Sequence, residues 1–404
     1  MTACILYDRI RAVKKKEIAF GNKKMVEQTR SKIKIAGAGP SGLTAAILLA
    51  RAGYDVDIFE ARDAVGARFI GDFQVIENMS RDEDALDMLK RFGLDTNFFI
   101  RPLRQALFFD HRLRSQPVQS RRPFAYAIRR GSEGETLDRG LLAQALAAGA
   151  KIHYQTRIKP EEADIVATGP ATPDGLAKEM TFTTSLPETI WVLFDMNLSP
   201  GGYAYLFVLD GVATFGCAIT QDLSRINHYF DRSLRRFQEM VSFPIKNDRT
   251  AYSFMNFSLK ESAESGGRRF VGEAGGFQDY LFGLGIRYAL TTGYAAAESL
   301  LKQTSYDRLW KEALGPAQET SVVNRFLYEL GGNQGLRLFI RRAGQGDLQN
   351  YLGSWHRASW WKRLALPVIK WQWRRSDRCA HRLSSHWCRS KPVSSHPELG
   401  PTKQ

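Results

Sequence analysis

Hydrophobic and polar positions alternate near the start of the chain in a way that predicts a strand–helix–strand unit. Residues 32–36 alternate charged and apolar side chains and then become apolar, which is typical of a buried strand. Residues 43–52 are rich in Ala and Leu and precede Gly53, a helix stop signal. Residues 54–59, "YDVDIF", alternate again and predict a second strand, which Glu60 closes.

The same patterns continue along the chain and predict a mixed α/β protein. Helices are expected at 82–92 and 141–148, and strands at 102–110, 122–130, 151–155 and 163–170. Three alternating runs follow at 188–198, 202–210 and 212–219, and Asp210-Gly211 between the last two is a strong hairpin signal. Residues 268–303 predict a strand, a glycine loop and a helix, and 304–354 are mainly helical. No internal repeat is evident.

The first predicted turn carries the G-x-G-x-x-G spacing in Gly37, Gly39 and Gly42. The first glycine allows a tight turn, the second lets the backbone approach a pyrophosphate, and the third lets the helix pack closely on the strand. The phosphates then face free N–H groups at a helix N-terminus. Glu60 lies where a carboxylate accepts hydrogen bonds from ribose hydroxyls and repels a 2′-phosphate, which disfavours NADP. The unit predicts a dinucleotide site and leaves FAD or NAD open.

The charge of the chain lies at its ends. The 404 residues carry a formal net charge of +15, and 44% of them are hydrophobic, as is ordinary for a globular protein of two or three domains. Residues 1–32 hold 9 basic and 3 acidic side chains, and residues 355–404 hold 11 and 2. Residues 33–354, which lie between these two ends, hold 37 basic and 37 acidic side chains and therefore have no formal net charge. Because residues 33–354 are neutral overall, the folded part of the chain is not expected to bind nucleic acid. The basic ends could instead bind a membrane surface or an acidic partner.

Cysteine usage and hydropathy indicate a reducing, cytoplasmic setting. Four scattered cysteines do not form a disulfide framework, there is no apolar signal-peptide core, and no run approaches 18 apolar residues. Met25 is an alternative start, which makes the first 24 residues a polar leader. A zinc site is not expected, because the spacing of four tail residues is too compact for a zinc finger: Cys379, His381, His386 and Cys388.

A second glycine cluster, at 270–300, resembles the second FAD motif of the geranylgeranyl reductase and aromatic hydroxylase group of flavoproteins. The matching positions are Gly272-Glu273-Ala274, Gly283-x-Gly285-Ile286, Ala289, Thr292-Gly293 and Ala296-Ala297. "EAR" at 60–62 and "DIVATGP" at 164–170 also resemble family segments, and the resemblance covers about 33–300. It implies FAD as the cofactor, with NAD as the alternative. The implied FAD-binding residues are Gly37, Gly39, Pro40, Ser41, Gly42, Glu60, Ala61, Arg62, Gly272, Glu273, Gly283, Gly285 and Ile286.

The implied fold is an α/β protein with a Rossmann-type FAD-binding domain, a mostly antiparallel substrate sheet and a helical C-terminal part. The predicted domains are a basic extension (1–32), a discontinuous FAD domain (33–180 and 262–303), a substrate sheet (181–261, joined by part of 68–128), a helical region (304–354) and a basic tail (355–404).

"PGGYAYLFV" at 200–208 resembles the substrate strand of the reductases, and a similar segment of the halogenases. It implies that Tyr203, Tyr205 and Phe207, which share one face of a strand, line the substrate cavity. This sequence departs from the family motifs at four positions. In the second FAD motif, Glu273 stands where the family usually has Asp, and Tyr280 stands where it has Pro. In the substrate strand, Tyr205 stands where the family has Trp, and Val208 stands where it has Pro. The archaeal reductases' Cys has no counterpart in "GARFIGD" from Gly66.

The activity that the resemblance implies is reduction of a carbon–carbon double bond in an apolar, prenyl-type or lipid substrate. Alternatives are a flavin monooxygenase, a halogenase (ranked lower, because its catalytic Lys has no convincing counterpart) and a catalytically silent, membrane-associated flavin binder. The catalytic residue is not identified, and Tyr203 and Tyr205 are only chemically able candidates. The electron donor, NAD(P)H or a ferredoxin-type protein, is not identified either.

The tail carries six of the eight tryptophans among basic side chains, at positions 355, 360, 361, 371, 373 and 387. One interpretation is a segment that lies on an anionic bilayer as a peripheral anchor, with tryptophans at the interface. The other is a helical lid over the substrate cavity. Both stay open, and nucleic-acid stacking is a distant third.

Overall fold

The computed structural model describes residues 31–170, 173–372 and 386–388, the last by their backbone alone. The chain divides into two compact units, Met1–Lys32 and Ile33–Gln404, and the second holds the elements described here. The alternative start at Met25, Trp373, Cys379 and His381 lie outside the described residues. Within the described part of the chain, no helix is long and apolar enough to cross a membrane, and no three His, Cys, Asp or Glu side chains cluster as metal ligands would.

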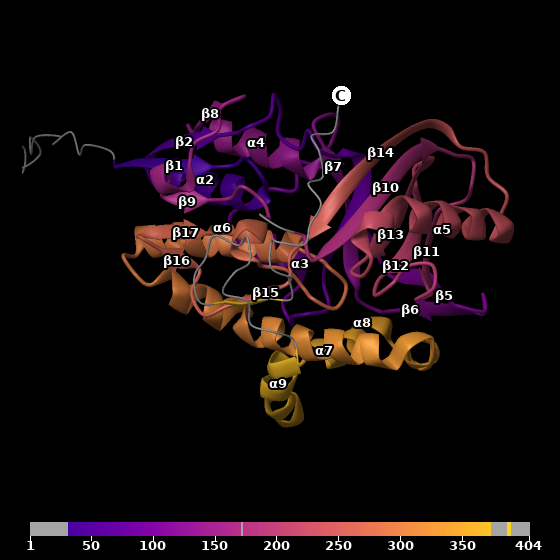
Figure 1. The fold of residues 1–404 in the computed structure, drawn as a ribbon. Helices are drawn as coiled ribbons and strands as arrows, with labels where there is room; N and C mark the ends of the chain where they lie inside the picture. Colours follow the sequence, from indigo (N-terminus) through magenta and orange to yellow (C-terminus); the bar gives the residue numbers. More distant parts are fainter. Residues whose placement is uncertain (1–30, 171–172, 373–385, 389–404) are drawn as a thin grey trace, which may run out of the picture. The chain divides into compact units, whose positions relative to one another are not determined.

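A six-stranded sheet carries the first glycine motif (Figure 1). Its strand order is β16 (Glu264–Ser265), β17 (Arg268–Phe270), β9 (Ile165–Val166), β1 (Lys32–Ala36), β2 (Asp55–Phe59) and β8 (Lys151–His153). β9 pairs in parallel with both β1 and β17, so segments far apart in the sequence become neighbours. Helix α2 (Pro40–Arg51) contacts both α4 (Leu137–Ala147) and α6 (Ile286–Leu301), and their apolar faces form one core with the sheet.

A seven-stranded, mostly antiparallel sheet makes the second layer. Its order is β14 (Lys246–Met255), β10 (Gly175–Thr183), β13 (Val212–Ile219), β12 (Tyr203–Leu209), β11 (Thr189–Phe194), β5 (Gln105–Asp110) and β6 (Ser115–Gln119), and only β11 and β5 pair in parallel. Helix α5 (Ile226–Met240) packs Phe230 and Phe237 against Phe215 of β13. A three-stranded sheet, β3 (Ile70–Glu77), β7 (Ala125–Gly131) and β4 (Ile100–Leu103), lies beside β10 and β13.

Two strand predictions have opposite outcomes. The Asp210-Gly211 hairpin is confirmed, because both residues have positive φ, 50° and 71°, as a tight two-residue turn between β12 and β13 requires. The single strand predicted at 102–110 is wrong. It breaks at Arg104, since β4 pairs with β7 whereas β5 pairs with β11 and β6, so the chain changes sheet there.

The C-terminal part is helical. Helix α7 (Tyr306–Ala343) is kinked at Gly332, whose φ of 49° and ψ of −155° are not helical, and α8 (Leu348–His356) and α9 (Trp360–Gln372) both contact it. Short elements complete the fold: α3 (Ala85–Arg91), three 3-10 turns at Pro160–Glu162, Leu223–Arg225 and Gly272–Gly275, and β15 (Ser258–Lys260) paired with β18 (His386–Cys388). The predicted domain boundaries remain predictions, although β10, which spans residue 180, lies wholly in the seven-stranded sheet.

Candidate functional site

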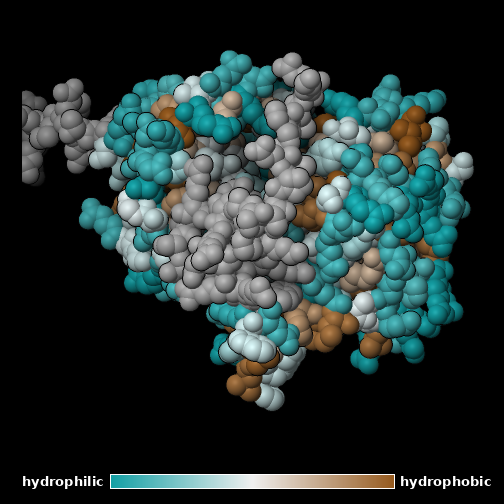
Figure 2. All heavy atoms as spheres, viewed as in Figure 1, coloured by the Kyte–Doolittle hydropathy of each residue, from teal (hydrophilic) through white to brown (hydrophobic). Residues whose placement is uncertain are grey.

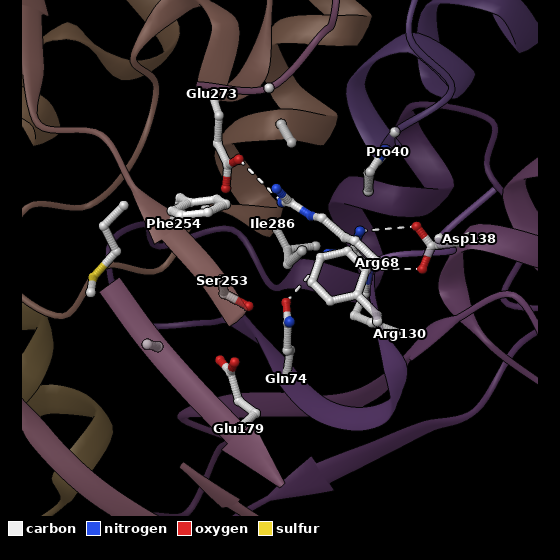
Figure 3. Close-up of a pocket in the computed structure, with 18 of the residues that line it drawn as sticks. Pro40, Arg68, Gln74, Arg130, Asp138, Glu179, Ser253, Phe254, Glu273 and Ile286 are labelled. Carbon is white, nitrogen blue, oxygen red and sulfur yellow. Dashed lines mark hydrogen bonds and ion pairs between the residues drawn. The ribbon is translucent and has the colours of Figure 1, made fainter. Parts of the chain in front are cut away.

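A cavity of about 490 Å³ reaches from the glycine turn after β1 to the inner face of the seven-stranded sheet (Figure 3). Most of the residues predicted to bind the cofactor line it: Gly39, Pro40, Ser41, Glu60, Ala61, Arg62, Glu273, Gly283, Gly285 and Ile286. The three predicted substrate residues Tyr203, Tyr205 and Phe207 line it too. The other predicted cofactor residues, Gly37, Gly42 and Gly272, lie outside the lining. The roles of all these residues stay predictions.

The glycines of the first motif divide into two that serve packing and one that faces open space. Gly37 has a φ of 103°, and a Cβ on it would lie 2.4 Å from the carbonyl oxygen of Ala167. A Cβ on Gly42 would lie 2.2 Å from the carbonyl oxygen of Gly37. Gly39 has an ordinary extended conformation, φ −79° and ψ 176°, and a Cβ there would meet nothing within 4 Å. The fold itself would therefore accept a larger residue at position 39. A ligand that approaches the backbone closely would require glycine there, because a side chain would occupy its space.

This open position lies at a helix N-terminus. Gly39 is the N-cap of α2, Pro40 follows it, and no side chain caps the helix. Uncapped N–H groups and the helix dipole make such a terminus favourable for a phosphate. The residues present therefore fit the pyrophosphate of a dinucleotide.

Glu60 joins the end of β2 to the glycine turn. Its Oε2 accepts a hydrogen bond from the backbone N–H of Ala38 at 2.9 Å, and its Oε1 accepts one from the N–H of Arg62 at 3.0 Å. The carboxylate is thus fixed at the cavity wall, and each oxygen retains a lone pair for a further donor such as a ribose hydroxyl.

The second glycine segment is brought against the first. A Cβ on Gly293 of α6 would lie 2.2 Å from the carbonyl oxygen of Ser41, so the two helices approach at backbone distance. The N–H of Gly272 donates to Thr292 Oγ1 at 2.9 Å, which fixes the Gly272–Gly275 turn on α6. Glu273 then reaches the cavity, where its Oε2 lies 3.3 Å from an Arg68 guanidinium nitrogen. This ion pair was not foreseen from the sequence.

An aromatic row forms the opposite wall. The rings of Tyr203, Tyr205 and Phe207 succeed one another on β12 with centroids 6.1 and 5.2 Å apart. Gly216 on β13 pairs with Tyr205, and a Cβ on it would lie 2.2 Å from the tyrosine ring, so its glycine makes room for that ring. The Tyr203 hydroxyl donates to the carbonyl oxygen of Phe282 at 2.8 Å. Burial raises the pKa of both phenols, which are therefore neutral hydroxyls at physiological pH.

The cavity also contains a buried acid that the sequence prediction missed. Glu179 lies on β10 with only 3% of its surface exposed, and its Oε1 accepts a hydrogen bond of 3.4 Å from the Tyr205 hydroxyl. Its Oε2 is buried without a hydrogen-bond partner. Burial, and secondly the charge of Asp72, raises the pKa of the Glu179 carboxyl to about 8. The available signal was one acid within an otherwise apolar run, "GLAKEMTF".

A further charged group at the cavity is already paired. The guanidinium of Arg130 on β7 donates to both carboxylate oxygens of Asp138, at 2.8 and 2.9 Å, and both side chains are almost fully buried. Figure 3 shows this pair beside Arg68 and Gln74. The wall opposite the aromatic row is therefore polar, while β12 itself presents only aromatic rings and neutral hydroxyls.

A strand, a glycine turn and a helix N-terminus, closed by a strand-end acid, define a Rossmann-type dinucleotide-binding fold. The NAD(P)-binding Rossmann-like domain family matches residues 35–71. No curated protein matches the sequence.

Solved structures share the fold over most of the chain. A geranylgeranyl bacteriochlorophyll reductase-like protein from Thermoplasma acidophilum is 16% identical with a TM-score of 0.63, over 85% of this chain and 98% of that one. The flavin-dependent halogenase CmlS is 17% identical with a TM-score of 0.55, over 88% and 72%. The oxygenase of 2-methyl-3-hydroxypyridine-5-carboxylic acid is 15% identical with a TM-score of 0.51, over 80% and 99%.

The predicted fold class, a Rossmann-type FAD-binding domain with an antiparallel sheet and a helical C-terminal part, is confirmed, as is the resemblance to the reductase and hydroxylase flavoproteins. The chain has the fold of FAD-dependent oxidoreductases and monooxygenases. Identities this low establish the fold and leave the reaction to be argued from the site.

Proposed function

We propose that this chain is an FAD-dependent oxidoreductase that reduces a carbon–carbon double bond in an apolar, prenyl-type substrate. The observation that carries the proposal is a single cavity with a dinucleotide cradle at one end and the aromatic row of β12 at the other. FAD would be held by the backbone at Gly39, by Glu60 and by Glu273. When bound, it supplies hydride chemistry, and the chain positions the substrate and excludes water.

The aromatic row favours an apolar substrate. Tyr203, Tyr205 and Phe207 offer ring surface without a free cation, and an apolar chain gains free energy when these rings remove it from water. A charged aromatic acid would require an unpaired Arg or Lys. Arg68 and Arg130 on the polar wall already contact Glu273 and Asp138. The other two lining arginines, Arg62 and Arg157, lie beside Glu60 at the dinucleotide end. The charge pattern of the cavity therefore supports a neutral substrate.

An anaerobic reoxidation experiment tests this function. The enzyme is reduced chemically and mixed with a polyprenyl lipid without oxygen, and flavin absorbance and lipid mass are followed. The proposal expects reoxidation, with two hydrogens gained by the lipid per flavin. Reoxidation only after oxygen is admitted, with oxygen or halogen in the product, would favour the monooxygenase or halogenase alternative. A flavin that no donor, NAD(P)H or ferredoxin-type, reduces would favour a silent flavin binder.

We also propose that α9 binds an anionic membrane surface. Leu366 and Ile369 belong to the same buried apolar cluster as Val322 and Val323 of α7. The opposite face presents large exposed apolar side chains, Trp360, Trp361, Leu364, Val368 and Trp371, and Figure 2 shows hydrophobic atoms gathered on this helix.

The positive charge of the segment around α9 favours an anionic partner. Residues 355–404 carry 11 basic and 2 acidic side chains, and among the described ones Arg363 on α9 is exposed. An exposed apolar stripe within a basic segment matches the interface of an anionic bilayer, where tryptophans lie at the headgroup level and cations contact lipid phosphates. A membrane surface would also supply the apolar substrate proposed above.

A further inference from the structure

Glu179 is placed as a reacting group rather than as a structural one. A buried carboxylate is ordinarily satisfied by hydrogen bonds or an ion pair, because an unpartnered one incurs the full desolvation penalty. Glu179 lines the cavity, is 97% buried, and receives one long hydrogen bond, from Tyr205, on Oε1, while Oε2 has no partner within hydrogen-bond distance and the Ser253 hydroxyl lies near enough to the carboxyl to lower its pKa. Figure 3 shows its carboxylate directed from β10 toward the cavity and Ser253.

Groups from every neighbouring element face this carboxyl. They are Asp72 on β3, Arg68 before β3, Tyr203 and Tyr205 on β12 and Ser253 on β14, while on β13 Glu179 pairs with Gly216, which has no side chain. Asp72 is itself buried and accepts hydrogen bonds from the N–H of Ile70 and from Gln74 Nε2, at 3.0 and 2.9 Å. Burial and the nearby Asp72 carboxyl both oppose a negative charge on Glu179 and raise its pKa to about 8. The group therefore carries a proton at neutral pH.

The hydrogen bond from Tyr205 determines where that proton lies. Because the Tyr205 hydroxyl donates to Oε1, the remaining oxygen, Oε2, is the one that holds the proton. After the proton leaves, the Ser253 hydroxyl, the positive charge of Arg68 and the Tyr205 hydroxyl stabilise the carboxylate. The arrangement is that of a general acid with a neighbour that stabilises its conjugate base.

Resting on the proposed function, we propose that Glu179 donates the proton that completes the reduction of the double bond. The π bond breaks, one carbon takes a hydride from reduced flavin, and the other forms a C–H bond with the proton of the Glu179 carboxyl. The O–H bond breaks, its electron pair stays on Glu179, and flavin is oxidised by two electrons. The carboxylate regains a proton from water before the next turnover, and the external electron donor reduces the flavin again. Tyr205 is the positioning residue.

Two variants and a control test the assignment. Glu179→Gln keeps the size of the side chain and removes the acid, Tyr205→Phe keeps the ring and removes the hydrogen bond, and Glu161→Gln changes an exposed glutamate away from the cavity. FAD content should match wild type in all three. The rate constant for anaerobic reoxidation by the polyprenyl lipid should fall about 10²-fold or more in Glu179→Gln, in line with the loss of a general acid. Tyr205→Phe should shift the alkaline limb of the pH–rate profile, and Glu161→Gln should change nothing.

A measurement without turnover accompanies the kinetics. Infrared difference spectra of the FAD-bound protein across pH 5–9 should show a protonated carboxyl signal in wild type that is absent in Glu179→Gln. Wild-type reoxidation rates in Glu179→Gln, or a raised KM with unchanged kcat, would overturn the proton-donor role. Absence of the infrared signal at pH 6 would overturn it as well. If wild type shows the signal yet reduces no double bond, the proposed function fails and the donor role with it.

Discussion

Replacing Gly39 by alanine separates the cofactor-binding role of the first glycine motif from its packing role. The backbone at Gly39 is extended, and a Cβ there meets nothing within 4 Å, so the folded apoprotein accepts the methyl group. Alanine lowers the entropy of the unfolded chain, which stabilises by about 0.4–1 kcal/mol. It is also a poorer N-cap than glycine, by an amount of the same order. The two effects offset each other, and the unfolding free energy of the apoprotein should change little.

FAD binding should respond quite differently. The added methyl group occupies the space through which the pyrophosphate approaches the backbone N–H groups of α2. Losing one hydrogen bond to a charged group removes about 1.5–3 kcal/mol, which corresponds to a roughly 10- to 150-fold weaker Kd. Gly39→Val should weaken binding further, to the point of yielding apoprotein on purification.

Gly42→Ala is the matched control. Its Cβ would lie 2.2 Å from a backbone oxygen, so it should destabilise the apoprotein by about 1–3 kcal/mol through overpacking. Thermal unfolding of apoprotein and fluorescence titration with FAD are measured for both variants. The reasoning is refuted if Gly39→Ala binds FAD as tightly as wild type, or if it destabilises the apoprotein as much as Gly42→Ala does.

Further predictions concern stability, the membrane and the buried ion pair. The folded pKa of Glu179, about 8 against an ordinary 4.5, means that the folded state binds more protons than the unfolded one between these values. The contribution of Glu179 to stability should therefore be fully present below about pH 4.5 and be lost, by up to about 5 kcal/mol, as pH rises to about 8, and denaturant unfolding of Glu179→Gln should lack this part of the slope. Liposome cosedimentation should show that Leu364→Ser with Trp371→Ser weakens binding to anionic vesicles at unchanged FAD content; binding equal to wild type, or loss of FAD, would favour the lid interpretation. Asp138→Ala leaves Arg130 buried without its carboxylate and should cost about 3–5 kcal/mol in urea unfolding, whereas a loss under 1 kcal/mol would mean that Arg130 finds another partner.

Local sequence signals predicted the parts of the fold that depend on near neighbours. The turn at Gly37, the helix that follows Pro40 and the Asp210-Gly211 hairpin each follow from backbone preferences within a few residues. The prediction that was wrong concerns a part of the fold that depends on residues distant in the sequence. The strand breaks at Arg104 because β4 and β5 pair in different sheets, and the hydrophobic pattern of residues 102–110 does not indicate this change of sheet.

The candidate site likewise contains residues that the sequence could predict and residues that it could not. The glycine cradle, Glu60 and the aromatic face of β12 could be predicted, since motif spacing and the strand period determine them. Glu179 could not, because its environment arises where β10 lies between β13 and β14, with Asp72 coming from another sheet. The ion pair of Arg68 with Glu273 joins residues 205 positions apart and has no local signature.

The absorbance spectrum of the purified protein, with quantification of the nucleotide released on denaturation, decides whether the cavity holds FAD. Wild-type protein should show flavin bands and release about one FAD per chain, with the bands strongly reduced in Gly39→Val and kept in the control Glu161→Gln. A colourless protein that binds no added FAD, or one that releases NAD instead, would contradict FAD as the cofactor.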